Sequence, residues 1–288
     1  MEPMSVDKDV DEMYNPTKWS MGLRGTARLL RCLQLYEIQN QNIGLTGPIE
    51  HVAYGPDERQ GLNVMRCSGT RQNDTMLVFI HGGYWIEGDR HMHNFVARGM
   101  HLHNISVITL GYRLATKGSG LDNCVDDVVL GIEKIQETFP TSNIFLAGHS
   151  AGGHLLMAAL PRLASLQGIR KVFSVSGIYS LWEVMHTSVG VQVGFTKEQC
   201  EKYSITPHPC YDIMDLQLVV SQYDPPGFRK QAEHFAASMQ RKRFRKKFVQ
   251  IIPNEDHFSL VENLFFEKAA LTLIFAGSYS PNRRPSKL

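Results

Sequence analysis

Short apolar runs alternate with longer amphipathic stretches along most of this chain. The later runs are nearly continuous in apolar side chains and rich in β-branched residues, which is typical of parallel strands buried on both faces. From this pattern we expect strands at 49–54, 61–66, 75–80, 105–110, 143–148, 171–176, 216–221 and 247–252.

Stretches with the period of a helix lie between these runs, at 92–103, 122–138, 152–163, 227–241 and 259–275. Strands that alternate with helices indicate a mostly parallel central sheet with helices on both faces. The length of 288 residues, without an internal repeat, fits one large α/β domain over residues 1–288.

Two segments depart from this alternation. Residues 1–48 form an N-terminal extension, in which 25–40 is predicted to be a helix that packs beside the sheet. Residues 177–213 form a long excursion with no clear strand. An insertion of that length after a late strand is typical of a lid over an active site, so we expect a lid there.

Composition and charge narrow the range of partners. Apolar residues make up 43% of the chain and charged residues 20%, as in an ordinary globular protein. The 30 Lys and Arg nearly balance the 28 Asp and Glu, which gives no electrostatic reason to expect a nucleic acid or an anionic membrane as partner. The basic run at 241–248 is interpreted as a solvated helix end, with a nuclear-localisation or anion-binding patch as the alternative.

Several signals bear on the compartment. The five cysteines are odd in number and form no CxxC pair, so we expect neither a disulfide framework nor a structural zinc site, and a reducing compartment fits. The polar N-terminus does not resemble a signal peptide, and no apolar run approaches the roughly 18–20 residues that cross a bilayer. We expect a cytoplasmic protein. The C-terminal Ser286-Lys287-Leu288 favours the peroxisome as the alternative, because the peroxisomal import receptor reads this tripeptide.

The segment Gly148-His149-Ser150-Ala151-Gly152 carries the strongest chemical signal. It follows a predicted strand and precedes a predicted helix, and this context is typical of a nucleophile elbow. Such a tight turn lifts the Ser150 hydroxyl above the edge of the sheet, and the two glycines remove side chains that would collide with neighbouring elements. Taken alone, Ser150 also fits a helix N-cap.

The second signal is His81-Gly82-Gly83-Tyr84-Trp85, directly after the strand at 75–80. Acyl transfer creates an oxyanion that backbone N–H groups must stabilise, and glycines let the backbone approach a substrate closely. We expect the oxyanion hole to use the N–H of Ala151 with a donor from Gly82 or Gly83, and Gly83 is the preferred one. His81 is expected to order the loop by hydrogen bonding. A plain Gly-Gly turn is the alternative.

A serine hydroxyl is a weak nucleophile, so it needs a base that an acid orients. After a nucleophile elbow the order along the chain is Asp or Glu and then His, each in a loop after a late strand. Asp224 follows the strand at 216–221, and His257 follows the strand at 247–252. The predicted triad is therefore Ser150, Asp224 and His257.

Other carboxylates and histidines fit these roles less well. Two carboxylates precede the strand at 216–221, and two adjoin His257, which rarely gives the opposed geometry of a triad: Asp212, Asp215, Glu255 and Asp256. Four histidines lie on or near one predicted helix: His91, His93, His101 and His103. Their i, i+2 spacing points them to different helix faces, so we expect exposed or capping histidines and no metal site.

Several stretches, in order along the chain, resemble the arylformamidase (kynurenine formamidase) family of the α/β-hydrolase superfamily. They are Tyr14-Asn15-Pro16 with Trp19, HGGYW at 81–85, GYRLA at 111–115, GHSAGGH at 148–154, SGIYSL at 176–181, QYDPPGFRKQ at 222–231 and DHF at 256–258. GHSAGG and the triad order are shared with many esterases. HGGYW is more specific, because related carboxylesterases and lipases usually carry a third glycine where this chain has Tyr84.

The resemblance implies an α/β-hydrolase fold and hydrolysis of N-formyl-L-kynurenine to L-kynurenine and formate, in tryptophan degradation. It implies a small-molecule substrate and no metal or organic cofactor, with a homodimer by analogy only. Tyr84 and Trp85 are hypothesised to form an apolar wall for the aromatic leaving group, with a place in the core as the alternative. The alternative functions are a general carboxylesterase or lipase-like hydrolase of short acyl esters and, in another class, a binding protein on a hydrolase fold.

Overall fold

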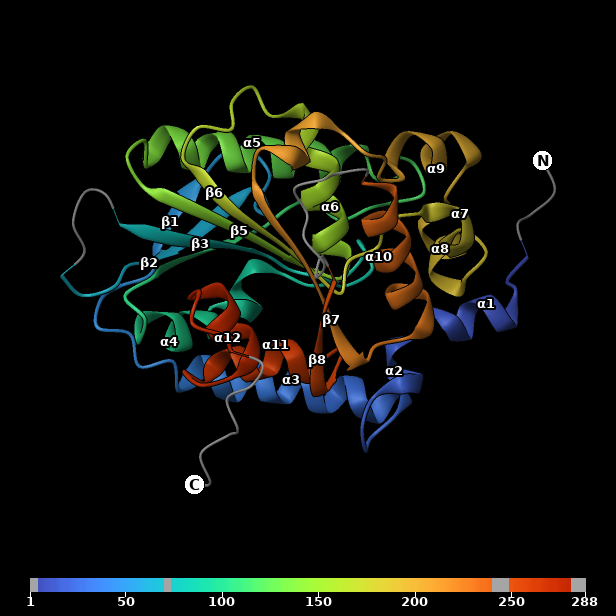
Figure 1. Cartoon of the computed structure of the whole chain (residues 1–288), viewed down its shortest axis with the longest axis horizontal. Helices are drawn as coiled ribbons and strands as arrows, with labels where there is room; N and C mark the ends of the chain where they lie inside the picture. The colour runs from blue at the N-terminus through green and yellow to red at the C-terminus, as the bar shows by residue number, and fades with distance from the viewer. Residues whose placement is uncertain (1–4, 70–73, 240–248, 281–288) are drawn as a thin grey trace.

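The strands assemble into one eight-stranded sheet in the order β1-β2-β4-β3-β5-β6-β7-β8 (Figure 1). This computed structural model describes residues 5–69, 74–239 and 249–280. The basic run at 241–248 and the C-terminal Ser286-Lys287-Leu288 therefore lie outside the described residues. The strands are β1 (Glu50–Ala53), β2 (Gly61–Met65), β3 (Thr75–Ile80), β4 (Ser106–Leu110), β5 (Asn143–His149), β6 (Ile169–Val175), β7 (Asp215–Tyr223) and β8 (Val249–Asp256).

The sheet is mostly parallel. Only β2 runs against its neighbours β1 and β4, whereas the pairs from β4 to β8 are all parallel. The predicted fold class is confirmed in this respect, and each predicted strand is present with small shifts at its ends. Because parallel strands present their carboxyl ends at one edge, the loops after β3, β5, β7 and β8 meet there.

Helices cover both faces of the sheet (Figure 1). One face carries α5 (Asp122–Thr138), α6 (Ala151–Ala159), which continues into η2 (Leu160–Arg162), and α10 (Pro226–Ser238). The other carries α3 (Gly25–Gln41), α4 (Val96–His101), α11 (Ser259–Glu262) and α12 (Ala270–Phe275). Successive side chains of β3 alternate between the two cores: Val78 packs under the first set of helices, and Leu77 and Phe79 under the second. Burial on both faces explains why the strands are continuously apolar.

Two predicted helices are divided in the structure. The stretch expected at 92–103 begins as a 3₁₀ turn, η1 (Arg90–His93), before α4. The stretch expected at 259–275 consists of α11, the 3₁₀ turn η4 (Asn263–Phe265) and α12. The second division arises where Phe266 takes an extended conformation, with φ −103° and ψ 133°, which ends the helical run.

The two segments that depart from the alternation contact one another (Figure 1). The N-terminal segment contains α1 (Lys8–Met13) and α2 (Pro16–Trp19) before α3, and 177–213 contains α7 (Leu181–Val184), α8 (Ser188–Val193), α9 (Lys197–Tyr203) and the turn η3 (Pro209–Asp212). The Asp7 N–H donates to the His186 carbonyl at 2.9 Å, and the Ser188 N–H donates to Asp11 Oδ1 at 2.7 Å. In the described residues no helix is both long and apolar enough to span a membrane.

The turn from β5 into α6 brings backbone into direct contact with backbone. A Cβ added to Gly152 would lie 2.3 Å from the Ile80 carbonyl oxygen and 2.4 Å from that of His81. A Cβ added to Gly148 would lie 2.3 Å from the Gly152 carbonyl oxygen. Since the opposing atoms are main chain, they cannot rotate away as a flexible side chain can. The two glycines therefore let α6 start against the end of β3.

We predict that Gly152→Ala destabilises the fold by about 2 kcal/mol or more, because the new methyl group overlaps two carbonyl oxygens. Chemical denaturation would measure the change in the free energy of unfolding. Gly118→Ala is the matched control, since a Cβ there meets nothing within 4 Å, and its effect should stay within about 0.5 kcal/mol. Equal stability of the two variants would contradict the packing argument.

Candidate active site

Ser150 occupies a strained turn at the head of α6. Its φ of 55° and ψ of −121° are rarely adopted by a residue with a side chain. The conformation is held from both sides: the Ser150 N–H donates to the Val175 carbonyl at 2.8 Å, and the His154 N–H donates to the Ser150 carbonyl at 3.1 Å. This is the geometry of a nucleophile elbow, which presents the hydroxyl beyond the end of the sheet.

His257 and Asp224 are joined by a buried hydrogen bond. The His257 Nδ1–H donates to Asp224 Oδ1 at 2.7 Å. The second oxygen, Oδ2, accepts from the Ser176 hydroxyl at 2.6 Å and from the Ser221 N–H at 2.6 Å. A buried carboxylate needs such donors to replace water. Asp224 lies after β7 and His257 after β8, so neighbouring strand ends bring the two side chains together.

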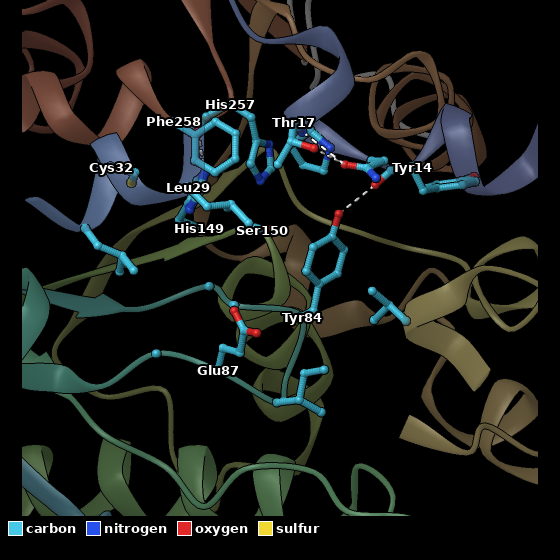
Figure 2. Close-up of a pocket in the computed structure, with 18 of the residues that line it drawn as sticks. Tyr14, Thr17, Leu29, Cys32, Tyr84, Glu87, His149, Ser150, His257 and Phe258 are labelled. Atoms are coloured by element: carbon cyan, nitrogen blue, oxygen red, sulfur yellow. Dashed lines mark hydrogen bonds between the residues drawn. The ribbon is translucent and has the colours of Figure 1, made fainter. Parts of the chain in front are cut away.

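A cavity of about 480 Å³ lies above this edge of the sheet (Figure 2). Ser150, His257, Gly82 and Gly83 all line it, whereas Asp224 lies behind the imidazole. With Tyr84, which also lines the cavity, the structure thus brings five of the predicted site residues to one surface. Their chemical roles stay predictions.

The glycine loop folds back against the elbow. Gly83 has a φ of 112°, and the N–H groups of Ile86 and Glu87 both donate to its carbonyl, at 3.0 and 2.9 Å. A Cβ added to Gly82 would lie 3.0 Å from the Ser150 Cβ. The loop backbone is therefore in contact with the residue predicted to be the nucleophile, which is where an oxyanion hole must lie.

Trp85 does not line the cavity, so the hypothesis that it forms part of the aromatic wall is wrong. Its side chain is 0% exposed and packs edge-on against Phe195. Its indole N–H donates to His154 Nδ1 at 3.2 Å. The physical reason is the backbone: Tyr84 and Trp85 both have positive φ, at 50° and 63°, and this turn directs the Trp85 side chain into the core. Tyr84 does line the cavity, and its hydroxyl donates to the Tyr14 carbonyl at 2.9 Å.

Two buried histidines stack near the start of the glycine loop. His81 Nδ1–H donates to the Gly82 carbonyl at 2.7 Å, and its ring stacks on Tyr112 with 4.3 Å between centroids. His93 was expected to be exposed or capping, and this is wrong, because it is only 5% exposed and packs between His81 and Tyr36. In the described residues no three His, Cys, Asp or Glu side chains are arranged to hold a metal ion.

His149, the first of the two variable residues of the GxSxG motif, contacts His257, the predicted base. Its Nε2–H donates to the His257 carbonyl at 3.0 Å, and the two ring centroids are 4.5 Å apart. Burial, followed by the proximity of His257, lowers the pKa of His149 well below its usual value, so the ring is neutral at pH 7. The motif alone gave no signal for this role, because it leaves the residue before the serine unspecified.

Arg28 holds the residues on both sides of His257. Its guanidinium donates to Glu262 at 2.6 and 3.0 Å and to Asp256 Oδ1 at 3.3 Å. It also lies over the Phe258 ring, 4.6 Å from the centroid. All of these charged groups are buried, which makes the helix α3 part of the scaffold of the histidine loop. One feature of the sequence could have indicated this role. Arg28 lies four residues before Cys32, so the two side chains share the buried face of the helix.

The N-terminal segment also supplies one wall of the cavity, which the sequence did not predict. Figure 2 shows Thr17 beside His257, and Tyr14 next to the hydroxyl of Tyr84. The residues of this wall are Asp11, Tyr14, Asn15, Pro16 and Thr17. The adjoining wall includes α8 and the residue before it, through Thr187, Ser188, Val189 and Gln192, and Ser188 bonds to Asp11 where the two walls meet. Residues 177–213, which were expected to form a lid, therefore reach the cavity through α8 and Thr187.

Comparison with known proteins places the fold. A family model described as the alpha/beta hydrolase fold matches residues 77–253. Kynurenine formamidase from Salmo salar is 28% identical over 275 residues, which cover 90% of this chain and 92% of that protein.

Solved structures are similar in fold. A proposed thioesterase from a Silicibacter species has a TM-score of 0.75 at 21% identity, covering 93% of this chain and 99% of that one. Esterase B from Lactobacillus rhamnosis has a TM-score of 0.65 at 16% identity, covering 87% of this chain and 90% of that one. The predicted α/β-hydrolase fold is confirmed.

We predict that acid destabilises the native state through its buried histidines. Burial lowers the pKa of His81 and His154 to about 4 and that of His93 to about 3, from 6.5. Below pH 6.5 the unfolded chain therefore binds protons that the folded chain does not, so the free energy of unfolding falls as the pH drops toward 4. His81 and His154 should each lower the free energy of unfolding by about 3 kcal/mol between pH 7 and pH 4. Urea unfolding at pH 7, 6, 5 and 4 would measure this decline.

His154→Gln provides the internal control for this prediction. The neutral His154 donates from Nε2 to the Tyr203 carbonyl at 2.8 Å and accepts from Trp85 at Nδ1. Glutamine carries a donor and an acceptor but does not titrate. The variant should be less stable at pH 7, and its stability should decline less steeply on acidification. A decline as steep as that of the wild type would mean that His154 does not contribute.

Proposed function

The chain belongs to the α/β-hydrolase superfamily, in its arylformamidase family, and from this premise we propose that it is a serine hydrolase that cleaves N-formyl-L-kynurenine to L-kynurenine and formate. In this proposal Ser150 is the nucleophile, His257 the general base and acid, and Asp224 the residue that orients the base. The reaction uses only groups of this chain and needs no metal or organic cofactor.

One observation carries the proposal. The Asp224–His257 hydrogen bond of 2.7 Å lies at the edge of the cavity that the strained Ser150 and the glycine loop also line. Nδ1 of the imidazole is occupied by the carboxylate, which leaves Nε2 to take a proton. A nucleophile, an oriented base and a close-packed loop of glycines are together what acyl transfer requires.

The proposed reaction has two steps. Ser150 Oγ attacks the formyl carbon while His257 takes the hydroxyl proton, and the N–H groups of Ala151 and of the glycine loop, with Gly83 preferred over Gly82, stabilise the oxyanion. His257 then protonates the leaving arylamine nitrogen, which would leave poorly as an anion. Water, deprotonated by the same imidazole, attacks the formyl ester, and the imidazolium returns the proton to Ser150 Oγ as formate leaves.

The cavity walls suit an aromatic leaving group. Tyr84, Phe258, Leu29 and Tyr36 line the cavity and offer apolar surface. Gly82 lies directly against Ser150, so the space for the acyl side chain on that side is small. A formyl group carries only hydrogen at that position. We propose that Tyr84 contacts the aryl part of the substrate, and that residues 177–213 act as a lid through α8.

A general carboxylesterase or lipase-like hydrolase of short acyl esters is the second candidate. The specific observation in its favour is the similarity of the fold to esterases, at a TM-score of 0.65 for esterase B. The same triad would act on either substrate class, because both reactions proceed through an acyl-serine intermediate. The two candidates therefore differ in the leaving group and not in the catalytic machinery.

We predict a higher kcat/KM for N-formyl-L-kynurenine than for short p-nitrophenyl esters, because the formyl group has only hydrogen where those esters carry an acyl carbon chain, and Gly82 leaves little space there beside Ser150. Steady-state assays on both substrates with the same preparation would measure the ratio. A large preference for the esters would contradict the formamidase proposal and favour the second candidate.

We further predict that Ser150→Ala lowers kcat by a factor of about 10⁴ or more. A fluorophosphonate probe should label the wild type and not this variant. Ser165→Ala, in an exposed turn remote from the cavity, is the matched serine control and should retain both labelling and activity. Labelling of Ser150→Ala would refute the assignment of the nucleophile, and an unlabelled wild type would favour a binding protein.

A further inference from the structure

Ser176 connects the strand of the predicted nucleophile with the strand of the predicted acid. It directly follows β6, which lies between β5 and β7 in the sheet. The preceding residue, Val175, accepts the Ser150 N–H at 2.8 Å. Ser176 itself donates its N–H to the Val219 carbonyl on β7 at 2.6 Å and its hydroxyl to Asp224 Oδ2 at 2.6 Å.

The backbone of Ser176 is held in an unfavourable conformation. Its φ of 45° lies in the left-handed region, which costs energy for a residue other than glycine. The side chain is 0% exposed, so its hydroxyl can reach no water. An ionised carboxylate can accept hydrogen bonds but cannot donate them, so the Ser176 hydroxyl is the donor in its bond to Asp224. Strain retained at a buried polar contact points to a functional constraint.

We propose that Ser176 is a positioning residue for the hydrolytic reaction. Its hydroxyl holds the Asp224 carboxylate in place and reduces the negative charge that the carboxylate presents to His257. The inference rests on the proposed function, because it concerns the same acid and base. Ser176 does not line the cavity. Its effect must therefore pass through Asp224, and it touches neither substrate nor the reacting atoms.

The direction of the electrostatic effect follows from the hydrogen bonds. A donated hydrogen bond stabilises the charge on a carboxylate. Without the Ser176 hydroxyl, Asp224 would keep the Ser221 N–H and His257 as partners, and more of its charge would face the imidazole. The imidazole would then hold a proton more tightly, so the acid limb of the pH profile of kcat/KM would move to higher pH.

A role confined to packing gives the opposite result. Loss of support alone would loosen the Asp224–His257 contact, and a looser contact holds the proton less tightly. The other charged or titratable groups near the pair are the neutral His149, whose ring centroid lies 4.5 Å from that of His257, and the cluster of Arg28, Asp256 and Glu262 behind the histidine loop. A change at Ser176 leaves all of these groups in place.

The test compares Ser176→Ala and Ser176→Gly with the wild type on N-formyl-L-kynurenine, or on a p-nitrophenyl ester if the wild type prefers it. We expect kcat to fall roughly tenfold or more with KM nearly unchanged, and the acid limb to move to higher pH. Both variants lose the hydroxyl, but only glycine adopts the φ of 45° without strain. Equal shifts in the two variants would assign the effect to the hydroxyl.

Tyr179→Phe is the control for a lost buried hydrogen bond in the same region. The Tyr179 hydroxyl donates to Ser174 Oγ at 2.8 Å and does not touch Asp224. This variant should unfold at a lower denaturant concentration and keep the wild-type pH profile.

Different results would overturn the proposed function and the role of Ser176. A wild type that neither hydrolyses these substrates nor reacts with a fluorophosphonate would overturn the proposed function, and the role of Ser176 with it. An active wild type whose Ser176 variants keep the wild-type kcat, or whose acid limb stays in place or moves to lower pH, would overturn the role of Ser176 alone.

Discussion

The contact between the start of α6 and the end of β3 sets the geometry of the whole site. Gly152 lies so close to the Ile80 and His81 carbonyl oxygens that no side chain fits between them. The glycine therefore lets the helix begin this close to the sheet, and Ser150, at its head, has a positive φ of 55°. Because the glycine loop directly follows β3, the same contact fixes where this loop meets the serine.

Charge around this turn is arranged in two buried layers. Asp224 carries the inner charge and is compensated by hydrogen bonds from Ser176, Ser221 and His257. Arg28, with Asp256 and Glu262, forms the outer layer behind the histidine loop. His149 lies beside His257 and is neutral, because burial opposes its protonation. A proton that arrives on His257 during a reaction would thus meet a carboxylate on one side and no competing cation on the other.

Local pattern was enough to predict much of this molecule. The strands were predictable because burial on both faces makes them continuously apolar, and the elbow because its constraint lies within five consecutive residues, 148–152. The order rule after the elbow led to Asp224 and His257, which the structure joins by a hydrogen bond. The features that could be predicted therefore depend either on a few consecutive residues or on the order in which this fold places its site residues along the chain.

The features that were missed depend on contacts between residues far apart in the chain. Ser176 is 48 positions from Asp224, and Arg28 is 234 positions from Glu262. Trp85 was placed wrongly because its direction is decided by two successive positive φ angles, for which a Tyr-Trp pair gives no warning.

The shared ion cluster of Arg28 has a consequence for how this chain can vary. One guanidinium on α3 bonds to two carboxylates that come from β8 and α11. Replacing Arg28 would leave both carboxylates in the interior without their cation, which is costly. The helix α3 and the histidine loop therefore depend on one another, and grafting either one onto a related hydrolase would require grafting the other as well.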